Sequence, residues 1–151
     1  MQFIKVFIPF LILNFGALGI GRWLMNNGPQ SEWYTNLNQA PWTPPGWVFG
    51  VAWTIIMICF SIYMAQLYLK IPTKEIITLF SMQFILNVLW NYVFFNQHQI
   101  ALGLLIIVLL TILICYFFFK FNTVTTRYLL LPYMVWLCIA TSLNAYIFIY
   151  N

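Results

Sequence analysis

The sequence predicts an all-α integral membrane protein, a bundle of five transmembrane helices whose long first loop, rich in tryptophan and proline, caps a cavity. Of its 151 residues, 64% are hydrophobic and only 5% are charged, whereas a soluble domain carries about 25% charged residues. Several apolar runs are long enough to cross about 30 Å of hydrocarbon as helices. The period-two alternation of a transmembrane β-barrel is absent, which favours helices.

The expected helices cover approximately residues 3–24, 47–69, 76–95, 100–121 and 128–150, within one membrane domain of residues 1–151. Short polar segments separate the last four runs, and only the first break is long. The first run is too long for a signal-peptide core and lacks a clear cleavage site, so we interpret it as a membrane helix. Pro132 lies in the fifth run, where it frees a backbone carbonyl and can kink the helix.

The basic residues indicate how the chain is oriented in the cell membrane. One side of the predicted bundle holds Lys5, Lys70, Lys74, Lys120 and Arg127, whereas the other holds only Arg22. The positive-inside rule therefore places the N-terminus in the cytoplasm, with the long first loop and the C-terminus outside. The net charge of +4 is explained by this topology, so we expect a lipid bilayer around the protein and no nucleic acid partner.

The long first loop combines rigid and aromatic residues. Pro41, Pro44 and Pro45 fix φ and disfavour helix at the residues before them. A stiff segment that carries rings can form a lid across the mouth of a bundle, and a preorganised lid loses less entropy when a ligand binds. Trp33 and Trp47 also suit an aromatic belt at the headgroup level, and both interpretations stay open for them.

Three tryptophans on different predicted helices lie within about two turns of the outer end. Trp53, Trp90 and Trp136 can point their indoles into one pocket beneath the loop, and such a pocket would suit a flat, apolar ligand. The alternative is that the indoles fill the bundle or face lipid. Asn87 and Asn91 share a helix face with Trp90. They could bond a neighbouring helix or orient a ligand; the first interpretation is favoured for Asn87, and neither is favoured for Asn91.

Other chemistry finds little support in the sequence. No ionisable side chain lies in the middle of a span, which argues against an ion-coupled transporter. Cys59, Cys115 and Cys138 lie in apolar runs with no CxxC or Cys/His cluster, so no metal site is expected. His98 stands alone in a short loop and is expected on the surface. No Ser/His/Asp arrangement and no phosphate-binding loop is visible.

Three stretches carry a resemblance to a known family. They read, in chain order, WYTNLNQAPWTPPGWVFGVAWT, LNVLWNYVFF and LLLPYMVWLCIATSLNAY. These resemble the loop and second helix, the third helix and the fifth helix of the translocator protein (TspO) family, also called tryptophan-rich sensory proteins or peripheral benzodiazepine receptors. The resemblance extends over essentially the whole chain.

This resemblance implies a homodimeric five-helix bundle that binds porphyrins such as protoporphyrin IX and haem, and drug-like isoquinoline carboxamides and benzodiazepines. No covalent cofactor is implied; porphyrin or haem would be the ligand. The implied ligand contacts are Tyr34, Trp53, Asn87, Trp90, Asn91, Trp136 and Ala140. The alternative is an enzyme that breaks down porphyrin with light and oxygen, with Trp53 and Trp136 as its catalytic residues. A conventional enzyme is not expected.

The sequence departs from the family pattern at several positions. Gln39 and Ala40 stand where the family usually has a basic residue and a proline, and Leu104 replaces a frequent acidic residue. The sterol pattern of the fifth helix needs a basic residue after its aromatic one. Here Tyr150 is followed by Asn151, so sterol binding is not expected from this pattern.

Overall fold

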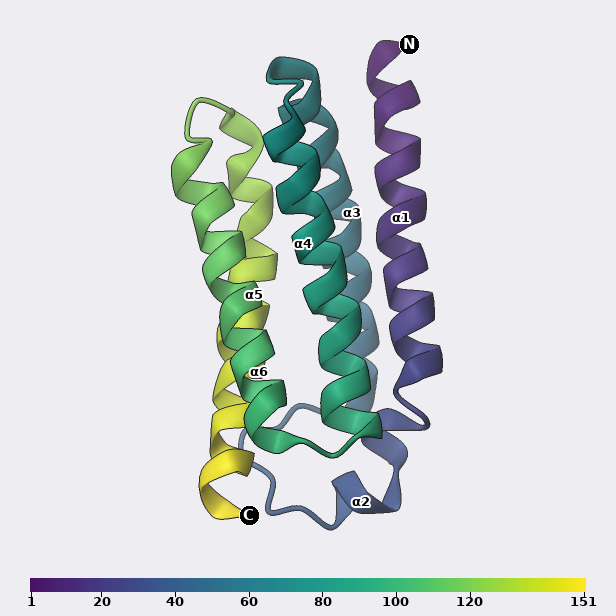
Figure 1. Ribbon diagram of the computed structural model, residues 1–151, viewed down its shortest axis with the longest axis vertical. Helices are drawn as coiled ribbons and strands as arrows, with labels where there is room; N and C mark the ends of the chain where they lie inside the picture. Colours follow the sequence, from purple (N-terminus) through teal and green to yellow (C-terminus); the bar gives the residue numbers. More distant parts are fainter.

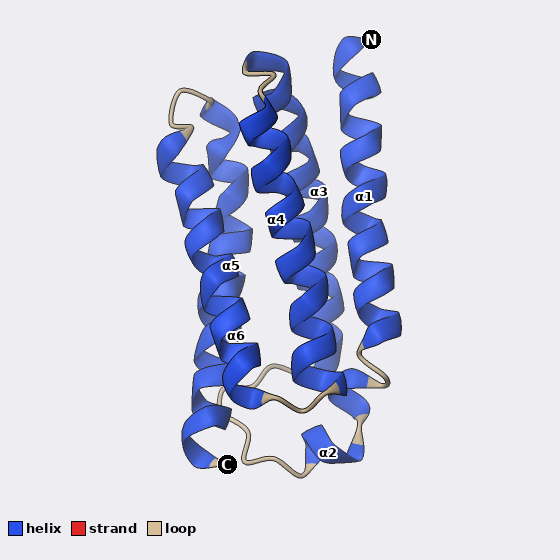
Figure 2. Cartoon of the chain, viewed as in Figure 1, coloured by secondary structure: helices blue, strands red, loops and turns tan.

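The computed structural model describes residues 1–151 and consists of helices and short connections without a strand (Figure 2). Five helices are long and apolar enough to span a membrane. They are α1 (Gln2–Leu24), α3 (Gly46–Lys70), α4 (Lys74–Asn91), α5 (Ile100–Lys120) and α6 (Leu131–Tyr150). The short elements are η1 (Gly28–Gln30), α2 (Glu32–Thr35), the π-helix η2 (Tyr92–Asn96) and η3 (Thr125–Leu130). The predicted five-helix, all-α membrane fold is confirmed.

The long helices stand side by side in one bundle (Figure 1). α4 packs against α1 on one side and α5 on the other, while α3 contacts α1 and α6. The N-terminus lies at one end of the bundle and the C-terminus at the other, as an odd number of spans requires (Figure 1). The first loop, residues 25–45, crosses the bundle at the C-terminal end and so covers one mouth of the helix assembly.

The helix ends follow from local backbone preferences. α1 is followed by Asn26, Asn27 and Gly28, whose φ values are 47°, 70° and 46°. Asparagine and glycine adopt this left-handed conformation more readily than other residues, so the chain can turn sharply here. α3 ends before Ile71, which has a non-helical backbone (φ −137°, ψ 75°), because the proline that follows disfavours helix at this position.

Pro132 lies at the start of α6 and not inside the helix, where a proline would be expected to produce a kink. The fifth spanning segment starts with the 3-10 turn η3, and Pro132 lies in the first turn of α6. A proline there breaks no helical hydrogen bond, because the first amides of a helix have no intrahelical acceptor. The proline inside a helix is Pro9 of α1.

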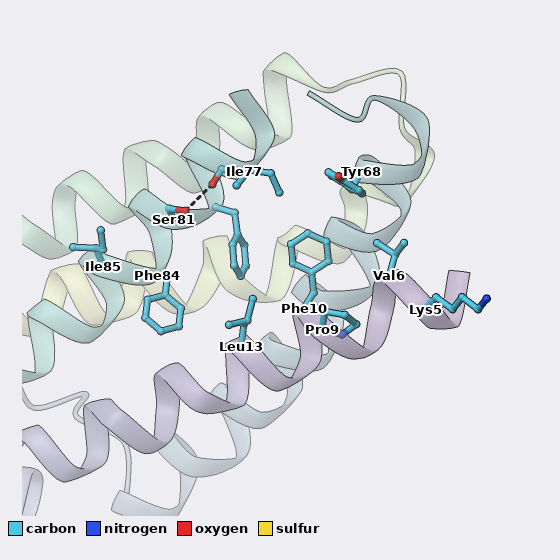
Figure 3. Close-up of a pocket in the computed structure, with 11 residues that line it drawn as sticks. Lys5, Val6, Pro9, Phe10, Leu13, Tyr68, Ile77, Ser81, Phe84 and Ile85 are labelled. Carbon is cyan, nitrogen blue, oxygen red and sulfur yellow. Dashed lines mark hydrogen bonds between the residues drawn. The ribbon is translucent and has the colours of Figure 1, made fainter. Parts of the chain in front are cut away.

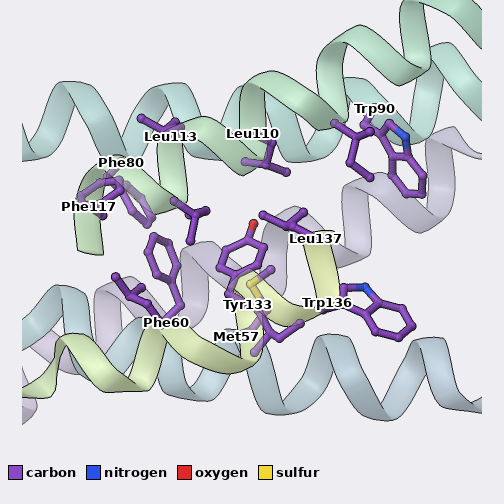
Figure 4. Packing of buried hydrophobic residues seen from close by; sticks show 14 of the residues in the cluster. Met57, Phe60, Phe80, Trp90, Leu110, Leu113, Phe117, Tyr133, Trp136 and Leu137 are labelled. Atoms are coloured by element: carbon purple, nitrogen blue, oxygen red, sulfur yellow. The ribbon is translucent and has the colours of Figure 1, made fainter. Parts of the chain in front are cut away.

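Aromatic rings fill the centre of the bundle between α3, α4, α5 and α6 (Figure 4). The ring of Phe60 lies 6.1 Å from Phe80, 6.1 Å from Phe117 and 5.5 Å from Tyr133, measured between centroids. Large apolar side chains such as Ile112 also cover the outside. A helical bundle that is apolar inside and outside is suited to a lipid environment, and the chain is a multi-pass membrane protein.

Candidate functional site

The first half of the loop is held by aromatic rings against η2 and the turn that precedes α5. Ser31 is the N-cap of α2, and its Oγ accepts a hydrogen bond from the Tyr34 amide at 3.3 Å. The Tyr34 ring is buried 5.3 Å from that of Phe95, and this burial raises the pKa of its phenol. Trp33 stacks on His98 at 4.2 Å. His98 is exposed, as predicted, but Trp33 covers one face of its ring.

The second half of the loop is held against α6. The Trp42 indole nitrogen donates a hydrogen bond to Oγ of Ser142 at 3.1 Å, and its ring lies 5.5 Å from Tyr146. The Asn38 amide donates to Oδ1 of Asn151 at 2.9 Å. The loop is therefore closed over the bundle by specific contacts at both of its halves.

Beneath the loop, the π-helix η2 turns two phenylalanines toward the core. Phe94 and Phe95 are both buried, and the Trp33 ring of the loop lies 5.6 Å from Phe94 in an edge-to-face arrangement. On its other side, Phe94 is stacked with Trp90 at 5.8 Å with an angle of 9° between the ring planes. Single π-helical turns are rare in proteins, and those that occur are often found at functional sites. In this chain the turn joins Trp33 of the loop to Trp90 of α4 through Phe94.

The three predicted site tryptophans turn inward. Trp90 and Trp136 are buried and Trp53 is half-buried. Trp136 meets Phe49 edge-to-face at 5.2 Å, and Trp53 meets Tyr133 at 5.8 Å. Figure 4 shows Trp90 and Trp136 on α4 and α6, at the same end of the core. Each indole therefore contacts rings of the protein, and no ring contact joins the three indoles to one another. These three indoles and the rings that they contact are called the aromatic layer.

A hydrogen-bonded chain joins two of the predicted site residues. The Trp90 indole nitrogen donates to Oδ1 of Asn144 at 3.2 Å, and Nδ2 of Asn144 donates to the Ala140 carbonyl at 3.0 Å. Ala140 is buried. It lies one helical turn after Trp136 on the same face of α6.

The two asparagines of α4 have different surroundings. Asn91 donates through Nδ2 to the Asn87 carbonyl at 2.9 Å and lies against α1, where an added Cβ at Gly21 would come within 2.8 Å of this nitrogen. Asn87 is only 2% exposed, and its Nδ2 has no hydrogen-bond partner. The favoured interpretation of Asn87, a bond to a neighbouring helix, is therefore not supported for this nitrogen. A buried donor without a partner is rare and calls for an explanation.

Polar pairs elsewhere link the helices at mid-membrane depth. Nδ2 of Asn14 donates to Oγ of Ser61 at 2.8 Å, and Nε2 of Gln83 donates to the Tyr133 hydroxyl at 2.8 Å. Both pairs are buried and join different helices, as is typical of membrane bundles. Sequence reasoning missed them, although single polar residues inside apolar runs were a visible signal.

Two open hollows lie at the opposite end of the bundle. One, of about 630 Å³, is between α1, α3 and α4, and the other, of about 410 Å³, is at the turn between α3 and α4. None of the predicted site residues lines either of them. No group of three or more His, Cys, Asp or Glu side chains is placed to hold a metal ion.

Comparisons with known proteins agree with this architecture. The sequence pattern of the TspO/MBR family matches residues 9–150. The tryptophan-rich protein TspO of Chlorobaculum tepidum is 33% identical over 85% of each chain. The tryptophan-rich sensory protein of Cereibacter sphaeroides is 31% identical over 75% of this chain and 73% of its own length. The human translocator protein is 27% identical over 78% of this chain and 74% of its own.

Proposed function

The chain belongs to the TspO/MBR family, and from this premise we propose that it is a membrane receptor or carrier for porphyrin-type ligands. Protoporphyrin IX, haem and drug-like aromatic molecules are the ligand class, and a sensor of stress or tetrapyrroles is the corresponding cellular role. The names of two relatives, a tryptophan-rich sensory protein and a translocator protein, fit a receptor or carrier. The ligand itself is inferred from the aromatic layer beneath the loop.

The buried amide of Asn87 is the observation that carries this proposal. Its Nδ2 is desolvated and has no partner, and leaving such a donor unpaired costs about 1–3 kcal/mol. A ligand that supplies an acceptor, such as a carbonyl or carboxylate oxygen, would remove this penalty. The binding site would thus have a donor on α4 close to the ring of Trp90, three residues further along the helix.

The aromatic residues supply the apolar part of the site. A planar ligand would replace the ring-to-ring contacts of Trp53 and Trp136 with stacking on its own faces, which is a favourable exchange for a large π-system. Tyr34, a buried residue of the loop, would cover the ligand, and the small side chain of Ala140 would leave space for it. Asn91 would contribute from the α1 side, and Trp90 from the α4 side.

Titration of the purified full chain with protoporphyrin IX tests the proposal through quenching of tryptophan fluorescence. Asn87→Leu should weaken binding about three- to tenfold, the value of one hydrogen bond. It should not lower the melting temperature, because the lost Nδ2 bonds nothing in the protein. Trp136→Phe should weaken binding as well. Trp47→Phe, at a side chain that is 71% exposed, is the matched control.

Two results would contradict porphyrin binding at this site. If Asn87→Leu destabilises the protein and leaves porphyrin affinity unchanged, the amide has a structural role. If quenching is absent, or equal in the Trp136→Phe and Trp47→Phe variants, the aromatic layer does not bind porphyrin.

The second candidate function is degradation of porphyrin with light and oxygen. It is favoured by the two indoles of Trp53 and Trp136, which enter the same layer through their contacts with Tyr133 and Phe49. An indole beside an excited porphyrin can donate an electron or react with singlet oxygen. Product analysis after illumination tests this function. If porphyrin is lost at the same rate with the Trp53→Phe/Trp136→Phe variant as with the unchanged protein, the two indoles do not catalyse its degradation.

Orientation and assembly belong to the same proposal. From the positive-inside rule we infer that the N-terminus is in the cytoplasm, so the loop and its site would face the outside. Gly16 and Gly19 of α1 have nothing within 4 Å of an added Cβ, so they offer a close approach for a second copy in a homodimer. Labelling of a cysteine at Asn38 from outside intact cells tests the orientation. Cross-linking through cysteines at Gly16 tests the dimer.

A further inference from the structure

The groove of about 630 Å³ lies between α1 and α4 at the end opposite the loop (Figure 3). Its walls are apolar: α1 contributes Phe10 and Leu13, and α4 contributes Phe84 and Ile85. Leu13 and Ile85 are 46% and 59% exposed, so the groove opens sideways toward the acyl chains of the bilayer. Such a shape suits a long apolar chain that lies along the helices.

The groove continues into a polar hollow at the turn between α3 and α4. Both are lined by Tyr68 and Ile77, and the polar hollow adds Thr73, Lys74 and Thr78. An apolar channel that leads to a polar chamber at the membrane edge matches the shape of an amphiphile, with a chain at one end and a headgroup at the other.

The positive charges at this end of the bundle favour a negatively charged headgroup. Lys5 lines the groove near the N-terminus (Figure 3) and Lys74 lines the polar hollow, and both are exposed. Neither forms an ion pair, because the only ion pair of the protein joins Lys120 to Glu75. No acidic side chain lines either hollow. Two uncompensated ammonium groups therefore stand beside the groove.

The start of α4 adds hydrogen-bond donors at the same place. Thr73 is the N-cap of α4, but its side chain accepts no hydrogen bond from the helix. The first amides of α4 are therefore not capped by Thr73, and the positive end of the helix dipole lies beside Lys74. An oxyanion at this position would meet the ammonium group, the Thr73 hydroxyl and these amides.

We propose that the groove binds an anionic phospholipid of the leaflet at the N-terminal end. An acyl chain lies between α1 and α4, the phosphate is bound by Lys74 and the start of α4, and Lys5 adds a second positive charge at the edge of the groove. This inference goes beyond porphyrin binding and does not depend on it, because the two sites share no residue. The positive-inside rule makes this leaflet the cytoplasmic one, where anionic headgroups attract basic juxtamembrane residues.

The same charges disfavour a second copy of the chain as the occupant. A two-fold axis through the groove would bring identical surfaces together. Lys5 and Lys74 would then face the same lysines of the partner. The nearest carboxylate on this end of α4, Glu75, is already paired with Lys120.

Photo-cross-linking in nanodiscs tests the proposal with the full chain. The probe is phosphatidylglycerol with a diazirine near the end of one acyl chain, diluted in phosphatidylcholine. Mass spectrometry should find the cross-links in peptides around Leu13 and Phe84. Unlabelled phosphatidylglycerol should compete, and extra phosphatidylcholine should not. Lys5→Gln/Lys74→Gln should reduce the preference for phosphatidylglycerol about thirtyfold, since each juxtamembrane lysine contributes about fivefold.

Two further variants separate this site from general charge effects. Lys70→Gln/Arg127→Gln removes the same net charge at the same end. It should reduce the preference much less than Lys5→Gln/Lys74→Gln does, because neither residue lines a hollow and Lys70 is bonded to the Thr123 carbonyl. Leu13→Trp fills the groove and should abolish the cross-links while the melting temperature is kept.

Three results would overturn the proposal. The first is equal labelling by phosphatidylglycerol and phosphatidylcholine probes. The second is an unchanged lipid preference in the Lys5→Gln/Lys74→Gln variant. The third is displacement of the lipid probe from the groove by protoporphyrin IX.

Discussion

The indole nitrogen of Trp90 donates a hydrogen bond to Oδ1 of Asn144 at 3.2 Å, and this bond ties α4 to α6 below the loop. The same indole stacks on Phe94, and Phe94 meets Trp33 of the loop. A continuous series of contacts therefore leads from α6 through α4 into the lid. Substitutions in the aromatic layer should therefore change both the stability of the bundle and the closure of the loop.

Removing one partner of the Trp90–Asn144 pair should destabilise the protein. Trp90→Phe keeps an aromatic ring but leaves the buried Asn144 carbonyl oxygen without its donor, and Asn144→Leu leaves the indole without its acceptor. Interhelical hydrogen bonds in membrane proteins contribute about 0.6 kcal/mol on average and up to about 1.7 kcal/mol. Denaturant unfolding of both single variants and the double variant should give a coupling free energy in this range.

Trp47→Phe serves as the control for the Trp90–Asn144 cycle, because Trp47 is exposed and forms no hydrogen bond to Asn144. Strict additivity of Trp90→Phe and Asn144→Leu would mean that the bond does not contribute to stability.

Closure of the loop should depend on Trp42. Trp42→Phe keeps a ring beside Tyr146 but removes the indole donor to Ser142. A net loss of about 0.5–1.5 kcal/mol should raise the population of the open loop about two- to tenfold. Hydrogen exchange of the amides of residues 37–43 reports this change directly. Ser142→Ala should produce a similar increase. Faster exchange in only one of the two variants would mean that the hydrogen bond between Trp42 and Ser142 does not hold the loop closed.

Gly103 should not tolerate a side chain. An added Cβ would lie 2.9 Å from Cδ2 and 3.0 Å from Cβ of Phe94, which is buried and in contact with Trp90 and Trp33. Overpacking of this kind costs about 1–3 kcal/mol, and Gly103→Ala should therefore lower the melting temperature. Gly16→Ala has open space around the new methyl group and should leave it unchanged or raise it slightly. Equal effects would show that α5 or Phe94 can move at no cost.

Much of the fold follows from the sequence because the bilayer sets strict limits. A span needs about 20 apolar residues in a helix, so hydropathy alone locates α1, α3, α4, α5 and α6 to within a few residues. The breaks are marked by polar segments and by residues that disfavour helix, such as Pro72. The 3-10 turn before α6 escaped this reasoning, since Pro132 suits both a kinked helix and the first turn of a new one.

The candidate site was less predictable. Helical spacing placed Trp90 and Asn91 on one broad face, but the structure turns Trp90 toward α6 and Asn91 toward α1. Adjacent residues on a helix differ by about 100° in direction, so packing decides which neighbour each one meets. The π-turn that brings Phe94 and Phe95 inward has no sequence signal of its own. The contact of Trp33 with His98 joins two loops, which periodicity does not describe.

The buried pair of Gln83 and Tyr133 allows a direct test of what an unpaired polar atom costs inside this bundle. Nε2 of Gln83 donates to the Tyr133 hydroxyl at 2.8 Å, whereas Oε1 of Gln83 has no partner. Tyr133→Phe should therefore leave both ends of the Gln83 amide unpaired, at a cost of about 1–3 kcal/mol. Adding Gln83→Leu should recover most of this loss, because replacing both partners with apolar groups removes every unpaired atom. Unfolding measurements on Tyr133→Phe and on Gln83→Leu/Tyr133→Phe compare the two states directly. A double variant that is less stable than Tyr133→Phe would contradict this account, and would mean that the free Oε1 of Gln83 is satisfied by a bound water or ligand.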